Sequence, residues 1–382
     1  MTNLQDAILR LQLHNTLVIL RTCGSDYQNA LVNDLTVPYH KIDLAAPSVR
    51  IQVEQNPEAF ARALPLPAYL HNLHYMPDLL KCLLESELPL GRIIADCKQN
   101  YYLRQAADSC ARQARFIELP LQYSGKKEFF SVTSYLDRCI NSEAAQDILS
   151  LIVGNGFGEQ TAAYIDCLLR REIMEQTTVK DEIKFYRFLC SVASMAGSVV
   201  NYAVLANNVG ISAPTAKQWL QFLEGAGAVY FIQPIDIAIP GRRLVKAPKL
   251  YFKDTSVAAC LLQITSAAAL ASSIHFKNIY ENYVVSRIRE SFLQRGLPFV
   301  AEFYRDSNNK EISLLLHDGN VLLPIIISAT DIKAAKLQKL LGLLKPAYVK
   351  GNINLGYAFL LALGGKVESL DVGLWRLNAG CL

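Results

Sequence analysis

The chain has 382 residues, of which 51% are hydrophobic and 19% are charged, and its formal net charge is +4. This composition is typical of well-packed globular domains and excludes a chain that is disordered throughout. The length suits roughly two or three domains at ~150 residues each. The charge is compatible with nucleic-acid contact but is too small to indicate it.

The nine cysteines are scattered and form no C-x-x-C pair. This pattern favours reduced thiols over a disulfide framework or a zinc ribbon. The first fifteen residues mix acidic, basic and polar side chains, unlike a secretory signal, and no uncharged apolar run approaches the ~20 residues of a membrane helix. We therefore expect a cytoplasmic protein without a membrane partner.

The first third of the chain alternates short apolar runs with helical patterns. The apolar runs predict strands over 16–22, 41–44, 67–71, 91–97 and 114–121. The segments between them predict amphipathic helices, among them 27–35, 57–63 and 101–112. Short apolar strands alternating with helices are typical of a parallel, doubly wound α/β sheet.

The middle of the chain is helical, with a turn predicted where three glycines fall within 154–158. The best-defined local pattern follows. It predicts a helix over 202–207, a turn at Gly210, an N-cap at Ser212, a second helix over 213–224 and a strand over 229–235. Helix, tight turn, helix and β-hairpin is a winged-helix pattern. Its expected core is Leu205, Ala216, Trp219, Leu220 and Leu223.

The last hundred residues begin with a predicted amphipathic helix over 280–294. Strands are expected over 299–306, 311–318, 321–329 and 353–363, with a helix over 331–345. This order predicts a second, independent α/β domain.

Several blocks of sequence together resemble one family, the prokaryotic AAA-type ATPases that carry a winged helix and a C-terminal restriction-endonuclease-like domain. They include YIDCLLRREI, VKDEIKFYRFLCSVASMAG, NNVGISAPTAKQWLQFLE, RRLVKAPKLYFKDTSVAACLL, IYENYVV and EFYRDSNNKEISLLLHDG. The resemblance implies an AAA-like parallel α/β domain (1–124), a helical extension (125–190), a winged helix (191–260) and a restriction-endonuclease-like α/β domain (270–382).

The nucleotide motifs of that family are degenerate here. A phosphate loop needs glycines for close amide contact, a lysine for the phosphates and a hydroxyl for Mg²⁺, in the form G-x-x-x-x-G-K-[ST]. The matching segment, RTCGSDYQNAL, keeps only Gly24, and Gln28 and Asn29 stand where the lysine and hydroxyl are expected.

The remaining ATPase positions also depart from the family. The strand over 67–71 is followed in the family by Asp-Glu, and the matching residues are His71 and Asn72, which cannot supply a carboxylate to Mg²⁺ or water. Asp96-Cys97-Lys98 occupies the position where the family has Thr-Gly-Ser, and Gln113 occupies the position of an arginine. The resemblance therefore implies a pseudo-ATPase.

The nuclease motif is degenerate in the same way. Nucleases of this fold place an acid on one strand and E-x-K on the next, to bind metal and activate water. The matching residues are Ser313, Ile326 and Ser328, and only Glu281 on the preceding helix survives as an acid. A divergent nuclease using Glu281, Glu311 and Asp306 is a further alternative.

Two other patterns bear on ligands. His71 and His74 form an H-x-x-H, for which surface or capping histidines are a better interpretation than a metal site.

The outward-facing positions of the second winged-helix helix are Lys217, Gln218 and Gln221. The segment 241–253 adds Arg242, Arg243, Lys246, Lys249 and Lys253. This basic segment either contacts DNA phosphates or packs between domains with its cations in solvent.

The leading hypothesis is a catalytically inactive binding or scaffold protein, without a cofactor, that acts on a protein partner or on duplex DNA. The alternative is an active ATP-binding protein with a divergent Mg²⁺-nucleotide site.

Overall fold

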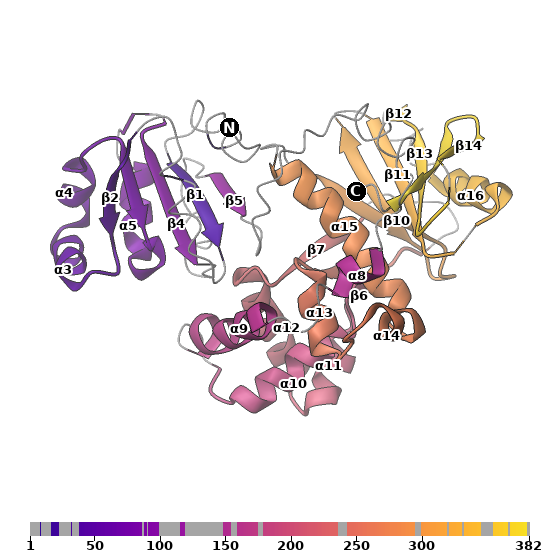
Figure 1. Ribbon diagram of the computed structural model, residues 1–382, viewed down its shortest axis with the longest axis horizontal. Coiled ribbons are helices and arrows are strands. Elements are labelled where there is room, and N and C mark those ends of the chain that lie inside the picture. The colour runs from indigo at the N-terminus through magenta and orange to yellow at the C-terminus, as the bar shows by residue number, and fades with distance from the viewer. Residues whose placement is uncertain are drawn as a thin grey trace.

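The computed structural model (Figure 1) describes most of the chain. The described residues are 8, 17–22, 32, 38–85, 88–89, 91–98, 115–118, 148–153, 159–174, 179–235, 243–294, 299–318, 321–330, 332–344, 354–365 and 367–379. None of the helices within these ranges is both long enough and apolar enough to cross a bilayer.

The N-terminal part is a five-stranded sheet in the order β2-β3-β4-β1-β5, and every neighbouring pair is parallel. Its strands are β1 (Leu17–Thr22), β2 (His40–Asp43), β3 (Ala68–His71), β4 (Ile93–Lys98) and β5 (Arg115–Glu118). Among the described residues, the helices beside it are α3 (Pro47–Gln55), α4 (Pro57–Arg62), α5 (Pro77–Glu85) and a 3-10 turn (Leu73–Tyr75). The five predicted strands and the parallel sheet are confirmed, whereas α3 was not predicted. The helical patterns 27–35 and 101–112 lie, apart from Val32, outside the described residues.

Both faces of this sheet are apolar, as a parallel sheet requires. One face packs Leu17 and Ile19 of β1 against the leucines of α5. The opposite face packs Val18 and Leu20 with Ile8 and Val32. Alternate residues of one strand therefore enter two separate cores, and the polar groups concentrate at the strand ends.

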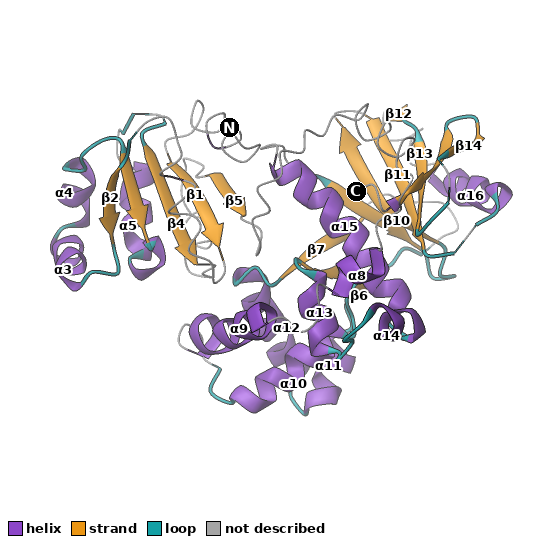
Figure 2. Cartoon of the chain, viewed as in Figure 1, coloured by secondary structure: helices purple, strands orange, loops and turns teal. Residues whose placement is uncertain are grey.

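The middle of the chain is helical (Figure 2). It comprises α8 (Ile148–Val153), α9 (Glu159–Cys167), a π-helical segment (Leu168–Met174), α10 (Glu182–Ala193), α11 (Tyr202–Val209), α12 (Ala213–Gly225) and α13 (Thr255–Leu261). Except for α8, which packs into the core of the C-terminal part, these helices share one core. The turn between α11 and α12 has the predicted chemistry, because Gly210 adopts φ 70° and the Ser212 side chain accepts from the Thr215 amide. The five residues expected in this core are all buried.

The C-terminal part is built on a second sheet, in the order β14-β15-β13-β11-β10-β9-β7-β8-β6 with β12 beside β11. Its strands are β6 (Ser198–Val199), β7 (Val229–Pro234), β8 (Lys249–Phe252), β9 (Ala301–Arg305), β10 (Glu311–Asp318), β11 (Val321–Ser328), β12 (Asn354–Leu355), β13 (Ala358–Ala362), β14 (Glu368–Asp371) and β15 (Leu374–Asn378). Its helices are α14 (Ala267–Ser272), α15 (Phe276–Gln294) and α16 (Ala334–Leu341).

This sheet corrects the prediction of an independent C-terminal domain. β7 pairs antiparallel with β8 and, at its end, parallel with β9, through Gln233–Glu302 and Pro234–Phe303. The hairpin of the expected winged helix and the strands of the expected nuclease domain therefore form one sheet. The boundaries at 260 and 270 stay predictions, because nothing in the fold tests them.

Two local predictions in this part were wrong. α15 is not amphipathic over its first half, because all residues over 279–285 are buried, including Glu281 and Asn282. The predicted strand 353–363 is two strands, β12 and β13, separated at Gly356, where a Cβ would lie 2.5 Å from the Leu323 side chain. β14 and β15 are short and rich in polar residues, and their sequences gave no strand pattern.

Candidate functional site

The carboxyl ends of β2, β3 and β4 lie side by side in the N-terminal sheet. Asp43 and His71 are register partners on β2 and β3, and β3 and β4 align through Leu70 and Ala95. Ligands of open parallel sheets bind outside this edge, so the side chains that occupy it decide what can bind.

One buried carboxylate, that of Asp96 on β4, organises this edge. Asp96 is 1% exposed. Its Oδ2 accepts from the Tyr69 hydroxyl and lies 2.6 Å from Nδ1 of His71, and its Oδ1 accepts from the Asn72 amide at 2.8 Å. Burial, followed by the charge of Asp96, raises the pKa of the Tyr69 hydroxyl, which therefore stays a donor. A buried carboxylate with three donors is a satisfied structural group.

His71 and Asn72 are both engaged in this network. The His71 side chain is 12% exposed and contacts Asp96, so the expectation of a surface or capping histidine was wrong. Asn72 has the left-handed φ of 65° and donates from Nδ2 to Oδ1 of Asp43 at 3.0 Å. Burial opposes the ionisation of Asp43, but the hydrogen bonds from Asn72 and the Ala45 amide outweigh it and lower the Asp43 pKa. The two positions that would carry acids in an ATPase hold neighbouring carboxylates in place.

The other predicted nucleotide positions, Gly24, Gln28, Asn29 and Gln113, lie outside the described residues. Their role stays a prediction. Within the described part of the chain, no group of three or more histidine, cysteine, aspartate or glutamate side chains is arranged to hold a metal ion.

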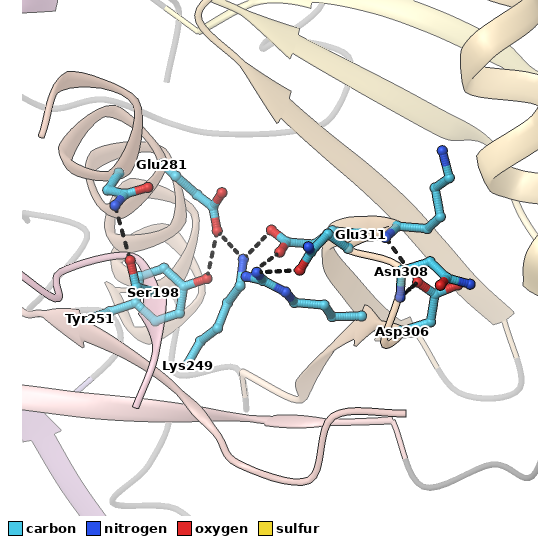
Figure 3. A network of polar contacts seen from close by, with 11 residues as sticks. Ser198, Lys249, Tyr251, Glu281, Asp306, Asn308 and Glu311 are labelled. Atoms are coloured by element: carbon cyan, nitrogen blue, oxygen red, sulfur yellow. Dashed lines mark hydrogen bonds and ion pairs between the residues drawn. The ribbon is translucent and has the colours of Figure 1, made fainter. Parts of the chain in front are cut away.

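A second polar centre joins three elements of the C-terminal part. Lys249 of β8 donates from Nζ to Oε1 of Glu281 on α15 at 2.6 Å and to Oε1 of Glu311 on β10 at 2.5 Å. The Tyr251 hydroxyl also donates to Oε1 of Glu281, at 3.0 Å, and Arg305 donates to Oε2 of Glu311 at 3.1 Å. Figure 3 shows Lys249 between the two glutamates, with Tyr251 beside Glu281.

The lysine at this centre is buried and charged. Lys249 is 1% exposed, so its assignment to the solvent-facing cations of the basic segment was wrong. Burial alone would lower the pKa of Lys249, but the carboxylates of Glu281 and Glu311 outweigh it and the pKa is raised. The buried ammonium therefore pairs with buried Glu281, while Glu311, which is 23% exposed, is shared between Lys249 and Arg305. The sequence held one sign of this arrangement, a lysine at the head of the apolar run KLYF, but no sign of its partners.

The degenerate nuclease residues are structural. The last register pair of the antiparallel β10–β11 ladder is Leu314 and Ile325, and Ser313 and Ile326 lie immediately beyond it. The Ser313 hydroxyl accepts from the Ile327 amide at 3.2 Å, where the β10–β11 ladder has ended. Ile326 is buried among apolar residues of α16 and β13.

Ser328 and Asp306 are also committed to local structure. The Ser328 hydroxyl donates to the Thr330 carbonyl at 2.6 Å. Asp306 is 1% exposed and accepts from the amides of Asn308 and Lys310, both at 2.9 Å. The acids of the divergent-nuclease alternative therefore do not converge: Glu281 and Glu311 share a lysine, and Asp306 closes a turn.

The predicted DNA-contact residues lie on two surfaces. Lys217, Gln218 and Gln221 of α12 are exposed, while the neighbouring Ala216, Trp219 and Leu220 are buried. Arg243 and Lys246 are exposed in the segment that leads to β8, and Arg242 lies outside the described residues. The helix presents polar side chains on its open face, as the 3.6-residue period predicts.

Comparisons with known proteins leave the activity open. Residues 157–268, less than half of the chain, match a family described as a domain of unknown function, DUF8612. No curated protein matches the chain. Among solved structures, it is similar to a Walker-type ATPase of Pyrococcus abyssi at 12% identity and a TM-score of 0.38, over 68% of this chain and 94% of that chain. A similarity this distant carries no argument here.

Proposed function

We propose that this chain is a catalytically inactive member of the AAA-type ATPase class that it resembles, and that it acts by binding a partner. The observation that carries the proposal is the ammonium of Lys249, which lies within hydrogen-bonding distance of Glu281 and Glu311. A metal-dependent nuclease needs its acids free to coordinate a cation and activate water. Here an internal cation occupies the space between those acids, and a lysine cannot supply a bound hydroxide.

The N-terminal edge supports the same interpretation. A Mg²⁺-nucleotide site needs one carboxylate for the metal and one to orient water. His71 and Asn72 instead supply donors to Asp96 and Asp43. Asp96 itself is buried with its oxygens occupied by donors. The polar groups at this edge satisfy one another and leave no carboxylate pair at the two motif positions.

A cleavage assay tests the proposal. Duplex DNA is incubated with the full chain in Mg²⁺ or Mn²⁺. The Glu281→Gln variant, purified by the same procedure, serves as the matched control. We expect no cleavage above buffer from either protein. Cleavage by the native chain that Glu281→Gln abolishes would overturn the proposal, and cleavage that persists unchanged in Glu281→Gln would identify a contaminant. Calorimetric titration with ATP, with and without Mg²⁺, tests the alternative, which micromolar binding would support.

The partner that we favour is duplex DNA, contacted through α12 and the basic segment. The supporting observation is the exposed row of Lys217, Gln218 and Gln221, since lysine and glutamine side chains on an open helix face can reach phosphates and base edges. Fluorescence anisotropy with a labelled duplex tests this. Lys217→Glu should weaken binding, whereas Lys336→Glu, the same change on the exposed face of α16, should not. Absence of binding by the native chain would contradict the DNA partner.

A further inference from the structure

The basic segment that follows residue 242 is attached to the C-terminal strands by its backbone. The Val245 amide donates to the Arg305 carbonyl at 3.0 Å, and the Ser307 amide donates to the Arg243 carbonyl at 2.9 Å. Leu244 and Asp306 form the antiparallel bridge between these two bonds. The segment therefore lies against the end of β9 as a short extra strand, and the turn between β9 and β10 is its direct neighbour.

That turn has a fixed shape. Oδ1 of Asp306 accepts from the amides of Asn308 and Lys310, and the Asn309 amide donates to the Asp306 carbonyl at 3.0 Å. Figure 3 shows Asn308 beside Asp306 at this turn. Asn309 takes φ 57°, and its side chain accepts from Arg305 at 2.9 Å. A turn with its backbone bonded in this way can present its outer side chains with little ordering cost on binding.

The side chains at the surface of the two paired segments are cationic or neutral and polar. Arg243, Lys246 and the whole of 307–310, which includes Lys310, are exposed. The acids of the same region are turned inward, because Asp306 is buried in the turn and Glu311 pairs with Lys249 and Arg305. We call residues 243–246 and 307–310 together the basic edge.

We propose that the basic edge is a phosphate-contacting surface for duplex DNA, in addition to the exposed face of α12. The inference rests on the DNA partner proposed above and adds the turn 307–310, which no sequence pattern indicated as a contact. Lysine, arginine, serine and asparagine side chains together with backbone amides are the usual partners of phosphate oxygens, and such contacts orient a protein on the duplex without reading sequence. The edge therefore contributes affinity and register, not base recognition.

Anisotropy titrations of the full chain with a labelled duplex, from 50 to 200 mM salt, test the edge. Lys310→Glu and Arg243→Glu should each weaken binding by at least about threefold. Each should also make the slope of log affinity against log salt shallower by about 0.9, the value for one lost phosphate contact. Lys336→Glu on α16 is the matched control and should change neither quantity. Lys310→Gln, which removes the charge without reversing it, should lie between the native chain and Lys310→Glu, and unfolding temperatures establish that all variants are folded.

The outcomes separate this inference from the one on which it rests. If the native chain binds and Lys217→Glu weakens it while Lys310→Glu and Arg243→Glu match the control, the DNA partner stands and the basic edge is overturned. If the native chain does not bind the duplex at 50 mM salt, both proposals are overturned. If poly-L-glutamate binds more tightly than the duplex and loses affinity in Lys310→Glu, the edge is a site for acidic protein, and its assignment to nucleic acid is overturned.

Discussion

Replacement of Lys249 by methionine removes the cation between Glu281 and Glu311 while keeping a side chain of similar length. The two carboxylates then face each other in a site where Glu281 is 5% exposed and Glu311 is 23% exposed. Removal of one partner from a buried ion pair costs about 3–5 kcal/mol. At about 2–4 °C per kcal/mol for a domain of 150–250 residues, the unfolding temperature should fall by about 6–20 °C.

The loss should depend on pH in a definite direction. In the native chain, burial raises the pKa of the Glu281 carboxyl although Lys249 lowers it. In the variant, burial and the charge of Glu311 act without the lysine to oppose them, so this pKa should rise further. A carboxyl whose folded pKa is raised loses stability as pH rises, because its ionisation is easier in the unfolded chain. The native chain keeps its pair, since the raised pKa of Lys249 preserves the ammonium charge up to and beyond its ordinary range near 10.4. The gap between native chain and variant should therefore widen as pH rises above the ordinary carboxyl pKa of 4.5.

Urea unfolding of the full chain, followed by circular dichroism, measures this effect. Adding Glu281→Gln to Lys249→Met should recover part of the loss, because it removes the unpaired charge of Glu281, while Glu311 keeps its bond from Arg305. Lys336→Met on α16 changes an exposed lysine in the same way and should stay within about 0.5 kcal/mol of the native chain. If Lys249→Met also stays within that range, Lys249 does not hold the two glutamates, and the account of this centre is refuted.

Three further predictions concern other parts of the fold. Gly197→Ala should destabilise the chain by more than about 2 kcal/mol, and Gly210→Ala by only about 1 kcal/mol, in urea unfolding. Both glycines have positive φ, but a Cβ on Gly197 would lie 2.4 Å from a backbone carbonyl oxygen of α15, and one on Gly210 meets nothing. Asn72→Ala should raise the pKa of Asp43 toward its ordinary value, as followed by carboxyl NMR, because its side-chain donor is lost. The lowered pKa means that Asp43 contributes stability above pH ~4 that is lost as pH falls, and this contribution should be smaller in the variant. An unchanged Asp43 titration would contradict the assigned hydrogen bond. Ile326→Glu returns an acid to the nuclease motif. It should prevent stable folding at neutral pH, because the position is 4% exposed in an apolar core. A folded variant that binds metal would disprove the placement of Ile326 in this core.

The sequence predicted those features whose causes are local. The α11–α12 turn was predictable because Gly210 and Ser212 carry its conformation and its cap. The strands of the N-terminal sheet were predictable because a strand buried on both faces is a short continuous apolar run. Asp96 could have been found by the same reasoning, since an acid inside the apolar run IIADC must have donors nearby.

The features that the sequence did not predict depend on contacts between distant residues. Lys249 meets Glu281 and Glu311, which follow it by 32 and 62 residues, and no local pattern links such partners. β7 and β9 pair in parallel through only two residues on each strand. A pairing this short produces no alternation of apolar and polar residues that the sequence could reveal. The sequence pattern of α15 predicted that its polar residues face solvent, but Glu281 and Asn282 are buried. They are hydrogen-bonded to β8, Glu281 by Lys249 and Asn282 by the backbone of Phe252.

The most direct test of the central claim is a crystal structure of the full chain soaked in Mn²⁺, with anomalous scattering used to locate the metal. The account predicts no manganese peak between Glu281 and Glu311, with the Lys249 ammonium in hydrogen-bonding contact with both carboxylates. A manganese peak coordinated by Glu281 and Glu311, with Lys249 displaced, would contradict it and return the divergent nuclease to consideration.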